Sequence, residues 1–463
     1  MEATTTRPEV PASTPERRSR ADLTVLGVEV GLVGAAVAVG AVLNARGVGL
    51  HADAAPLFAT WGPHVGWGTP AAVLVALGVL GPGLAWARTA GWVPLLGAAW
   101  VTSVAWTLAL GLVDGWSTGL TERLTPQAEY LHEVPRVTDV AAMLAGFTGR
   151  ILDFQPDSWS THTAGHPPGA LLVFVGLDRV GLGGGTAAAL ACVLVGATVT
   201  VSVPVALRAL GAVDAARAVV PFLVLLPGAV WVGASADGLF AGVVAAGLAL
   251  LAVRGRAAPA AGGLLLGFAL HLSYGFVLVG LLALAVLALR PSGRLSALTA
   301  GAVGVGAVVL AFEVAGFRWW DGYQLVVERY YQGWAADRPY AYWVWANLAA
   351  LLLCAGPVLG PALRRAVRAG VGAVRAGLRR AGGPRALPMV VGPTVLLPAT
   401  AAVVVLAADL SGLSKAEVER IWLPFAVWLL VATVHLPPGA RRWWLAGQAA
   451  TALAVNHLVW TVS

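Results

Sequence analysis

Long apolar segments separated by short polar ones dominate the chain from Leu23 to its C-terminus. Most of these segments approach the length of about 20 residues that a helix needs to cross the hydrocarbon core of a bilayer. The pattern predicts an all-α fold, a polytopic transmembrane helical bundle with about eleven spanning helices. We expect the spans at 23–43, 70–87, 92–113, 186–207, 218–232, 239–253, 296–317, 343–363, 389–408, 421–435 and 443–462.

Two apolar segments do not fit a simple crossing. Residues 169–183 are short and carry Asp178 and Arg179, so we expect a juxtamembrane helix on the outer face. Residues 258–289 lie between Arg256 and Arg290, and two crossings would need roughly 40 residues. We therefore expect a re-entrant helix pair there, a form that is tolerated where it is buried in protein or lines a cavity.

The charges give the chain an orientation. Its residues are 58% hydrophobic and 11% charged, against about 25% charged in soluble domains. The net charge of +7 comes from arginines in short loops, which fits the positive-inside rule and argues against a nucleic-acid partner. We expect residues 1–22 to be a disordered cytoplasmic N-terminus and 23–463 a single transmembrane domain in the cell membrane. Residues 364–385 hold seven arginines and no acid, which predicts a basic cytoplasmic loop.

This orientation gathers mixed polar residues on the extracytoplasmic side. Residues 114–168 form the largest loop there, and Asp114 directly follows an apolar span. A carboxylate fixed at a helix end suits a general base, so Asp114 is the candidate catalytic residue and Asp53, in an earlier outer loop, is its rival. The candidate substrate-binding residues on the same side are Glu129, Tyr130, His162, His166, Asp237, Arg329, Glu417, Glu419 and Arg420.

The histidines and Arg420 have simple alternative interpretations. His162 and His166 are four residues apart, but a metal site needs three or more ligands, so orientation of a phosphate or hydroxyl, or a simple turn structure, is favoured over metal binding. The sequence gives no support for a divalent cation or another cofactor. Arg420 can clamp a phosphate through two parallel hydrogen bonds, or it can belong to an interfacial salt bridge with Glu417 or Glu419. Both interpretations of Arg420 stay open at this point.

Several short motifs resemble the GT-C superfamily of integral membrane glycosyltransferases, near its protein O-mannosyltransferase and aminoarabinose-transferase branch. The matching features are the acid after an outward helix (Asp114), EYL at 129–131, HPPG at 166–169, SADGLF at 235–240 and the run GLLLGFALHLSYGF at 263–276. The likeness covers roughly residues 92–289. ERIWLPF at 419–425 also resembles a motif of uncharacterised actinobacterial integral membrane proteins.

The resemblance implies a membrane glycosyltransferase with a polyprenyl-phosphate-linked sugar as donor, reached from the membrane lipid. It also implies that Asp114 deprotonates a hydroxyl of an unknown acceptor, while Arg420 offsets charge on the departing lipid phosphate. The sequence departs from the family at Gly115, where a second acid is common, and in its two additional N-terminal helices. The alternatives are a multi-pass transporter or lipid flippase, and a catalytically inactive cell-envelope scaffold.

Overall fold

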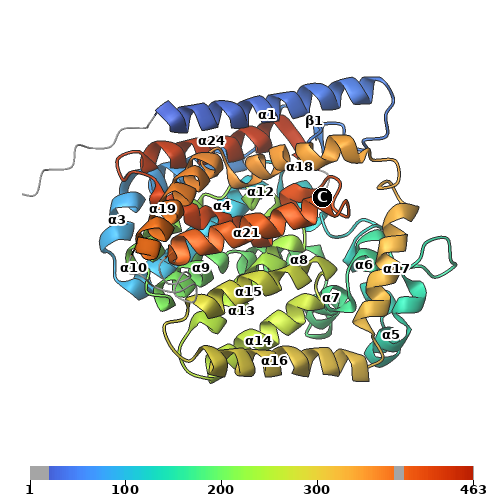
Figure 1. The fold of residues 1–463 in the computed structure, drawn as a ribbon. Coiled ribbons are helices and arrows are strands. Elements are labelled where there is room, and N and C mark those ends of the chain that lie inside the picture. The colour runs from blue at the N-terminus through green and yellow to red at the C-terminus, as the bar shows by residue number, and fades with distance from the viewer. Residues whose placement is uncertain (1–19, 380–390, 462–463) are drawn as a thin grey trace, which may run out of the picture.

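The computed structural model describes residues 20–379 and 391–461, and in these ranges the chain is almost entirely helical. The long helices run roughly along one direction (Figure 1). Two short strands, β1 (Ala59–Trp61) and β2 (Val459–Thr461), pair antiparallel. The predicted all-α bundle is confirmed, and this small ribbon is an addition that the hydropathy pattern did not indicate.

The described residues contain six helices that are long and apolar enough to cross a membrane. A bent pair, Tyr340–Ala355 and Leu359–Gly377, meets the same criterion when the two helices are taken together. The chain is therefore a helical membrane protein, but helix length and composition support six or seven crossings and not about eleven. The six helices are Arg20–Ala45, Gly68–Thr89, Trp92–Gly111, Gly185–Ala209, Arg294–Val314 and Pro393–Leu410.

The N-terminal part builds three of these long helices and then a loop of short ones. Most of the predicted disordered N-terminus lies outside the described residues, although Arg20 and Asp22 already belong to the first helix. The elements after α1 (Arg20–Ala45) and β1 are α2 (Gly68–Gly78), η1 (Val79–Gly83), α3 (Leu84–Thr89), α4 (Trp92–Gly111), η2 (Ser117–Thr121), η3 (Tyr130–His132), η4 (Val134–Arg136), α5 (Val140–Gly146), η5 (Thr148–Arg150), α6 (Thr161–Gly165) and α7 (Pro168–Arg179).

The central part contains the most broken segment of the bundle. The single helix expected at 218–232 was wrong, because Pro221 and Pro227 lack the backbone N–H that a continuous helix needs. The elements here are α8 (Gly185–Gly196), α9 (Val199–Ala209), α10 (Val213–Ala218), α11 (Val220–Val224), α12 (Ala229–Val232), α13 (Asp237–Ala252), α14 (Ala257–Leu270), η6 (Tyr274–Leu278), α15 (Val279–Leu289) and α16 (Arg294–Val314). The expected helix pair appears as α14 and α15, and its re-entrant placement stays a prediction.

The C-terminal part corrects one further prediction and gives helical structure to the predicted basic loop, whose cytoplasmic placement stays a prediction. The straight helix expected at 343–363 is bent by 95°, because Gly356 has a left-handed φ of +90° and Pro357 follows it. The loop expected at 364–385 is helical as far as Arg379, and its remainder lies outside the described residues. The elements are α17 (Trp319–Gln332), α18 (Tyr340–Ala355), α19 (Leu359–Arg379), α21 (Pro393–Leu410), α22 (Val418–Ile421), α23 (Leu423–Leu429), η8 (Leu430–His435), α24 (Arg441–Leu458) and β2.

The helices form a buried centre and an apolar exterior. α13 lies in the centre, and most of its residues are buried. α1 and α16 cover opposite sides of the bundle (Figure 1) and expose large apolar side chains such as Val28 and Val303. Apolar side chains that face outward are expected where a helix meets lipid.

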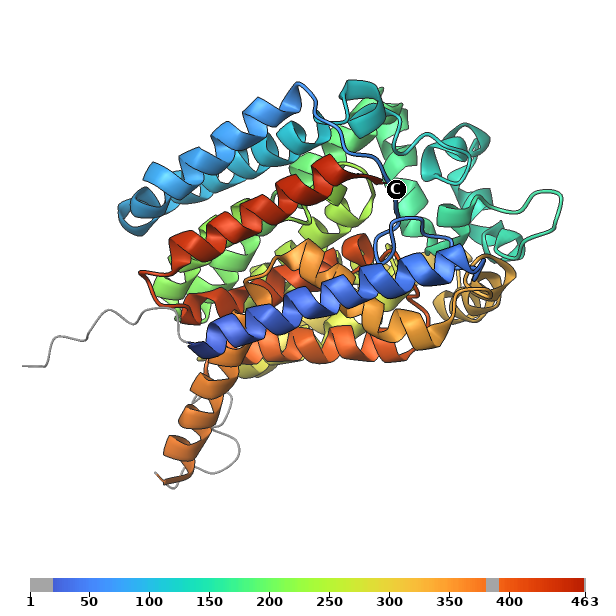
Figure 2. The ribbon, with the colours of Figure 1, turned by 90° about the horizontal axis from the view of Figure 1, so that it is seen from above.

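The two ends of the bundle differ in chemistry. The short helices of the 114–168 loop gather at one end together with α17, while α3, α10 and α19 gather at the opposite end (Figures 1 and 2). Arg88, Arg217 and Arg365 belong to the second group of helices. The polar loop and the arginine-rich segments are therefore separated by the length of the bundle.

Small residues let α14 and α16 pack closely. A Cβ atom at Gly263 would overlap the carbonyl oxygen of Gly301, and one at Gly304 would overlap the carbonyl oxygen of Ala260. Gly263 and Gly267 are four residues apart, the spacing with which membrane helices bring their backbones together. This contact holds α14, the first helix of the predicted re-entrant pair, against α16.

Gly263→Ala should lower the stability of the protein by about 1–3 kcal/mol, because the added methyl group forces the two backbones apart. Gly306→Ala, on the partner helix α16 but facing open space, is the matched control and should leave the melting temperature unchanged or slightly higher. Thermal unfolding in detergent measures both. Equal melting temperatures for the two variants would contradict close packing at Gly263.

Candidate functional site

A buried group of charged residues lies where the polar loop meets the core. We call it the Arg420 cluster, and it consists of Glu129, His162, Asp237, Glu417 and Arg420. Four separate parts of the chain supply it: the turn before η3, helix α6, the first residue of α13, and the residues at and before α22. All five were candidate residues in the sequence, and the structure brings them together.

Arg420 is the centre of the cluster, and its side chain is 6% exposed. Its Nη1 donates to Asp237 Oδ2 at 2.8 Å, and its Nη2 donates to Glu417 and, at 3.2 Å, to His162 Nε2. Burial lowers the pKa of Arg420, but the charges of Glu417 and Asp237 outweigh it and hold the pKa above its usual value. The guanidinium is therefore permanently charged, and its Nε–H has no hydrogen-bond partner among the described residues.

His162 links Arg420 to Glu129. A guanidinium can only donate hydrogen bonds, so His162 Nε2 accepts from Arg420. This leaves the ring proton on His162 Nδ1, which lies 2.6 Å from Glu129 Oε1. The side chains of His162 and Glu417 are 20% and 18% exposed, whereas those of Asp237 and Glu129 are at most 8% exposed. His162 and Glu417 therefore form the accessible edge of the cluster.

His166 and Tyr130 form a neutral layer behind this edge. The Tyr130 hydroxyl lies 2.9 Å from His166 Nδ1, and that nitrogen lies 2.8 Å from the carbonyl oxygen of His162. Burial lowers the pKa of His166 and raises the pKa of Tyr130, so both side chains are uncharged near neutral pH. Pro168 begins α7 directly afterwards, a position where a missing N–H costs nothing. His166 thus supports the site through the backbone of His162.

A strained turn presents Glu417 to two arginines. Ala416 and Glu417 have φ angles of +70° and +63°, a left-handed conformation that costs non-glycine residues about 1–3 kcal/mol each and that concentrates at functional sites. Arg338 Nη1 donates to Glu417 Oε1 at 3.0 Å from the side opposite Arg420. Burial raises the pKa of Glu417, but the charges of Arg420 and Arg338 outweigh burial and lower it to about 2.

Glu419 is the most unusual carboxyl group near the cluster. It is fully buried, its Oε1 accepts from the Phe58 N–H at 2.9 Å, and its Oε2 has no partner among the described residues. Burial raises the pKa of Glu419 to about 7. Phe58 belongs to the segment between α1 and α2, so this segment covers the Glu419 side of the site.

Asp114 belongs to a second group, which we call the Asp114 cluster and which consists of His64, Asp114 and Arg123. Asp114 Oδ1 lies 2.8 Å from His64 Nε2, and Asp114 Oδ2 accepts from Arg123 Nη2 at 3.0 Å. His64 stacks on Trp460 at 3.7 Å between ring centroids. The hydrogen-bond partners of Asp114 are thus distinct from those of Arg420, and its catalytic role stays a prediction.

Two other candidate residues, Asp53 and Arg329, have partners outside both clusters. Asp53, the rival base, has an exposed side chain, and its carbonyl oxygen is 3.4 Å from Asn44 Nδ2. Arg329, on α17, forms an ion pair with Asp153 of the polar loop. The hydrogen-bond and ion-pair partners of Asp53 and Arg329 thus differ from those of Arg420.

Sequence reasoning missed the partners that complete the two clusters. His64 and Arg123 were not candidates, although both lie in polar segments that flank apolar spans. Arg338 was not among the candidates either, yet it donates to Glu417 and to the carbonyl oxygen of Lys415. Among the described residues, no group of three or more His, Cys, Asp or Glu side chains is arranged to hold a metal ion.

Comparison with protein-family models, with curated proteins and with solved structures finds no match to this chain. The Arg420 cluster and the adjacent Glu419 offer one permanent cation with an unused donor, carboxylates that hold this cation in place, and one carboxyl group, Glu419, that can change its protonation near neutral pH. These are the parts of a site that stabilises negative charge and moves a proton.

The pKa of Glu419 makes stability depend on pH. The folded-state pKa of Glu419 is raised from 4.5 to about 7. The contribution of Glu419 to the free energy of unfolding is therefore fully present below pH 4.5 and is lost as the pH rises through 7. At about 1.4 kcal/mol for each pH unit, the loss is roughly 3 kcal/mol.

Glu419→Gln stays neutral, so it should raise the melting temperature at pH 8 and change it little at pH 4.5. Glu328→Gln, an exposed carboxyl on α17, should have no such effect, and the same pH profile for wild type and Glu419→Gln would contradict the assignment.

Arg420→Gln should destabilise the protein by about 3–5 kcal/mol, because it leaves Asp237 buried without its cation and removes one of the two cations that hold Glu417. Adding Asp237→Asn should recover part of this loss, since the uncompensated charge of Asp237 is then removed. Unfolding of both variants, and of Asp237→Asn alone, measures the coupling. Purely additive effects would show that the two residues do not stabilise one another.

Proposed function

We propose that this chain is a membrane glycosyltransferase that moves a sugar from a polyprenyl-phosphate donor to an acceptor hydroxyl on the extracytoplasmic side. The observation that carries the proposal is the buried, permanently charged Arg420, with one unused N–H, at the polar end of the bundle. A cation in a poorly solvated position stabilises a departing phosphate far better than the same cation in water.

The proposed orientation places the N-terminus in the cytoplasm and the 114–168 loop outside. It is supported by the separation between α3, α10 and α19 at one end and the polar loop at the other (Figure 1), because arginines near short loops favour the cytoplasmic side. In this scheme α7 is an outer-face juxtamembrane helix and α14 and α15 form the re-entrant pair. The four remaining crossings of the eleven fall to the shorter segments 213–232, 237–252, 423–435 and 441–458.

The donor phosphate would approach the exposed edge of the Arg420 cluster. There one phosphate oxygen would replace Glu417 as the hydrogen-bond acceptor of Arg420 Nη2, and a second would accept a hydrogen bond from the unused Nε–H. Such a two-point contact suits phosphate. Asp237 would keep Nη1 in position during the exchange, and Arg338 would retain Glu417 on its other side. The carboxylates therefore act by positioning the cation.

Transfer would proceed in one displacement. The acceptor hydroxyl gives its proton to Asp114, and its oxygen attacks the sugar carbon. The bond from that carbon to the phosphate oxygen breaks, the electron pair stays on polyprenyl phosphate, and the configuration at the carbon is inverted. Asp114 is held by His64 and Arg123, which would fix its direction for proton abstraction.

One observation favours an alternative from a different class. Arg420 is already paired with two carboxylates, as in a structural ion-pair network, and this would suit an inactive cell-envelope scaffold. A multi-pass transporter or lipid flippase would share the lipid ligand but would move it between leaflets without breaking it. Three measurements therefore separate these functions: binding of the lipid phosphate, cleavage of the lipid-linked sugar, and movement of the lipid between leaflets.

Purified protein in nanodiscs should be stabilised by polyprenyl phosphate, the leaving group common to such donors, and Arg420→Lys should weaken the effect because lysine lacks the planar fork. With a panel of polyprenyl-phosphate monosaccharides, Asp114→Asn should bind but release lipid phosphate at least about 100-fold more slowly. Asp53→Asn, an exposed carboxylate, is the matched control and should stay active.

Three outcomes would contradict the proposal in different ways. No stabilisation by polyprenyl phosphate would favour the scaffold. Binding without cleavage, accompanied by movement of a labelled lipid across proteoliposomes, would favour the flippase. Cleavage that survives Asp114→Asn but is lost in Asp53→Asn would move the base to the earlier outer loop.

A further inference from the structure

The second half of α19 leaves the body of the protein. Its first half is packed in the bundle, where Leu359, Ala362 and Ala366 are almost completely buried. Arg364 and Arg365 there form ion pairs with Asp22 at the start of α1. The later half of the helix projects from the bundle at the end opposite the polar loop (Figure 2). The packed half therefore anchors a helix whose outer half is open to its surroundings.

The projecting half has an apolar stripe beside a basic stripe. Val367, Val371 and Val374 are spaced by four and three residues and therefore lie on one helical face. Val367 is 60% exposed and Val371 44% exposed. Arg368 and Arg375 are also exposed, and each directly follows one of these valines in the sequence. A helix with this division of faces is suited to the boundary between lipid headgroups and acyl chains.

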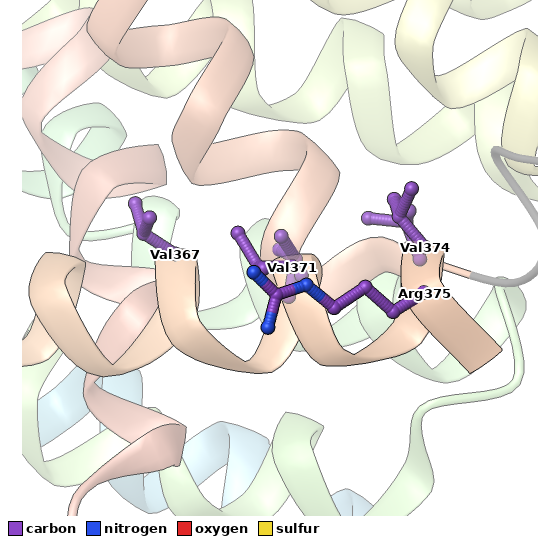
Figure 3. A pocket seen from close by; sticks show the side chains of 7 residues that line it. Val367, Val371, Val374 and Arg375 are labelled. Atoms are coloured by element: carbon purple, nitrogen blue, oxygen red, sulfur yellow. The ribbon is translucent and has the colours of Figure 1, made fainter.

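The valines line a cleft of about 420 Å³ between α19 and the start of α21. Its walls are Val367, Gly370, Val371, Val374, Val391 and Val395, and Arg375 is its single charged lining residue. In Figure 3 the Arg375 side chain extends along the helix toward Val371. The cleft thus combines a surface for hydrocarbon with a guanidinium at its margin.

The charge around the cleft selects its occupant. The described part of α19 around the cleft, residues 359–377, contains four arginines and no acidic residue, so an anionic ligand is complementary and a cationic or zwitterionic one is not. A second copy of α19 would bring like charges together. An anionic lipid supplies both the hydrocarbon and the negative phosphate that the cleft and its arginines can bind.

We propose that the outer half of α19 is a binding site for an anionic phospholipid, with an acyl chain in the valine cleft and the phosphate on Arg375 and Arg368. This lipid stands apart from the sugar donor and the Arg420 cluster, which lie toward the other end of the bundle. The site would hold α19 flat on one membrane surface and keep its first half fixed against Asp22.

The test uses the full-length protein in detergent with phosphatidylglycerol or phosphatidylcholine added, and native mass spectrometry to count bound lipids. Wild type should retain phosphatidylglycerol selectively. Arg368→Gln with Arg375→Gln should lower this retention about fivefold for each arginine. Arg254→Gln with Arg256→Gln, two exposed arginines outside α19, is the matched control and should retain the lipid as wild type does.

A second variant separates lipid from free phosphate. Val371→Ser should weaken phosphatidylglycerol binding, while glycerol 3-phosphate should not compete for the site, because the acyl chain is part of the contact. Effective competition by glycerol 3-phosphate would overturn the lipid assignment. Equal loss in the control pair would reduce the effect to general surface charge, and a change from dimer to monomer in the α19 variants would assign the face to a second copy of the chain.

Discussion

The burial of the Arg420 charge is the constraint on which the polar end of this protein depends. A guanidinium removed from water is tolerated only when charged partners and good geometry replace its hydration, and Arg420 has Asp237 on one nitrogen and Glu417 on another. To satisfy it, the chain brings α13, α6 and α22 to one point. The polar loop is ordered around this point because His162 and Glu129 continue the same network.

The surrounding architecture keeps the cluster fixed at a cost in local strain. The left-handed residues Ala416 and Glu417 would not persist in an isolated turn, and Lys415 and Arg338 hold that turn through backbone carbonyl groups. Phe58 closes the site from the N-terminal side through Glu419. A strained turn, a carboxyl group with a pKa of about 7 and an unused guanidinium N–H therefore occur within a few residues of one another.

The two ends of the bundle are suited to two kinds of contact with the membrane. At the polar end, charge is paired and largely buried, as in a site that handles one specific ligand. At the other end, arginines are exposed along α19 beside valines, as in a helix that rests on many similar lipids. The helices between them are bound partly by small residues, and Gly263 and Gly304 show how closely α14 and α16 approach.

Composition and periodicity by themselves determined that this is a helical membrane protein, where most helices begin, and which end collects the acids and histidines. These features follow from transfer of side chains between water and lipid, which is a local property of each segment. The members of the Arg420 cluster could also be predicted from the sequence, because the orientation inferred from the arginines gathers mixed acids, histidines and Arg420 on one side. Only the tertiary structure decided that Asp114 pairs with His64 and Arg123, that Pro221 and Pro227 break one span, and that Arg364 joins Asp22. Such pairings depend on how distant segments pack, and no local pattern in the sequence encodes that distance.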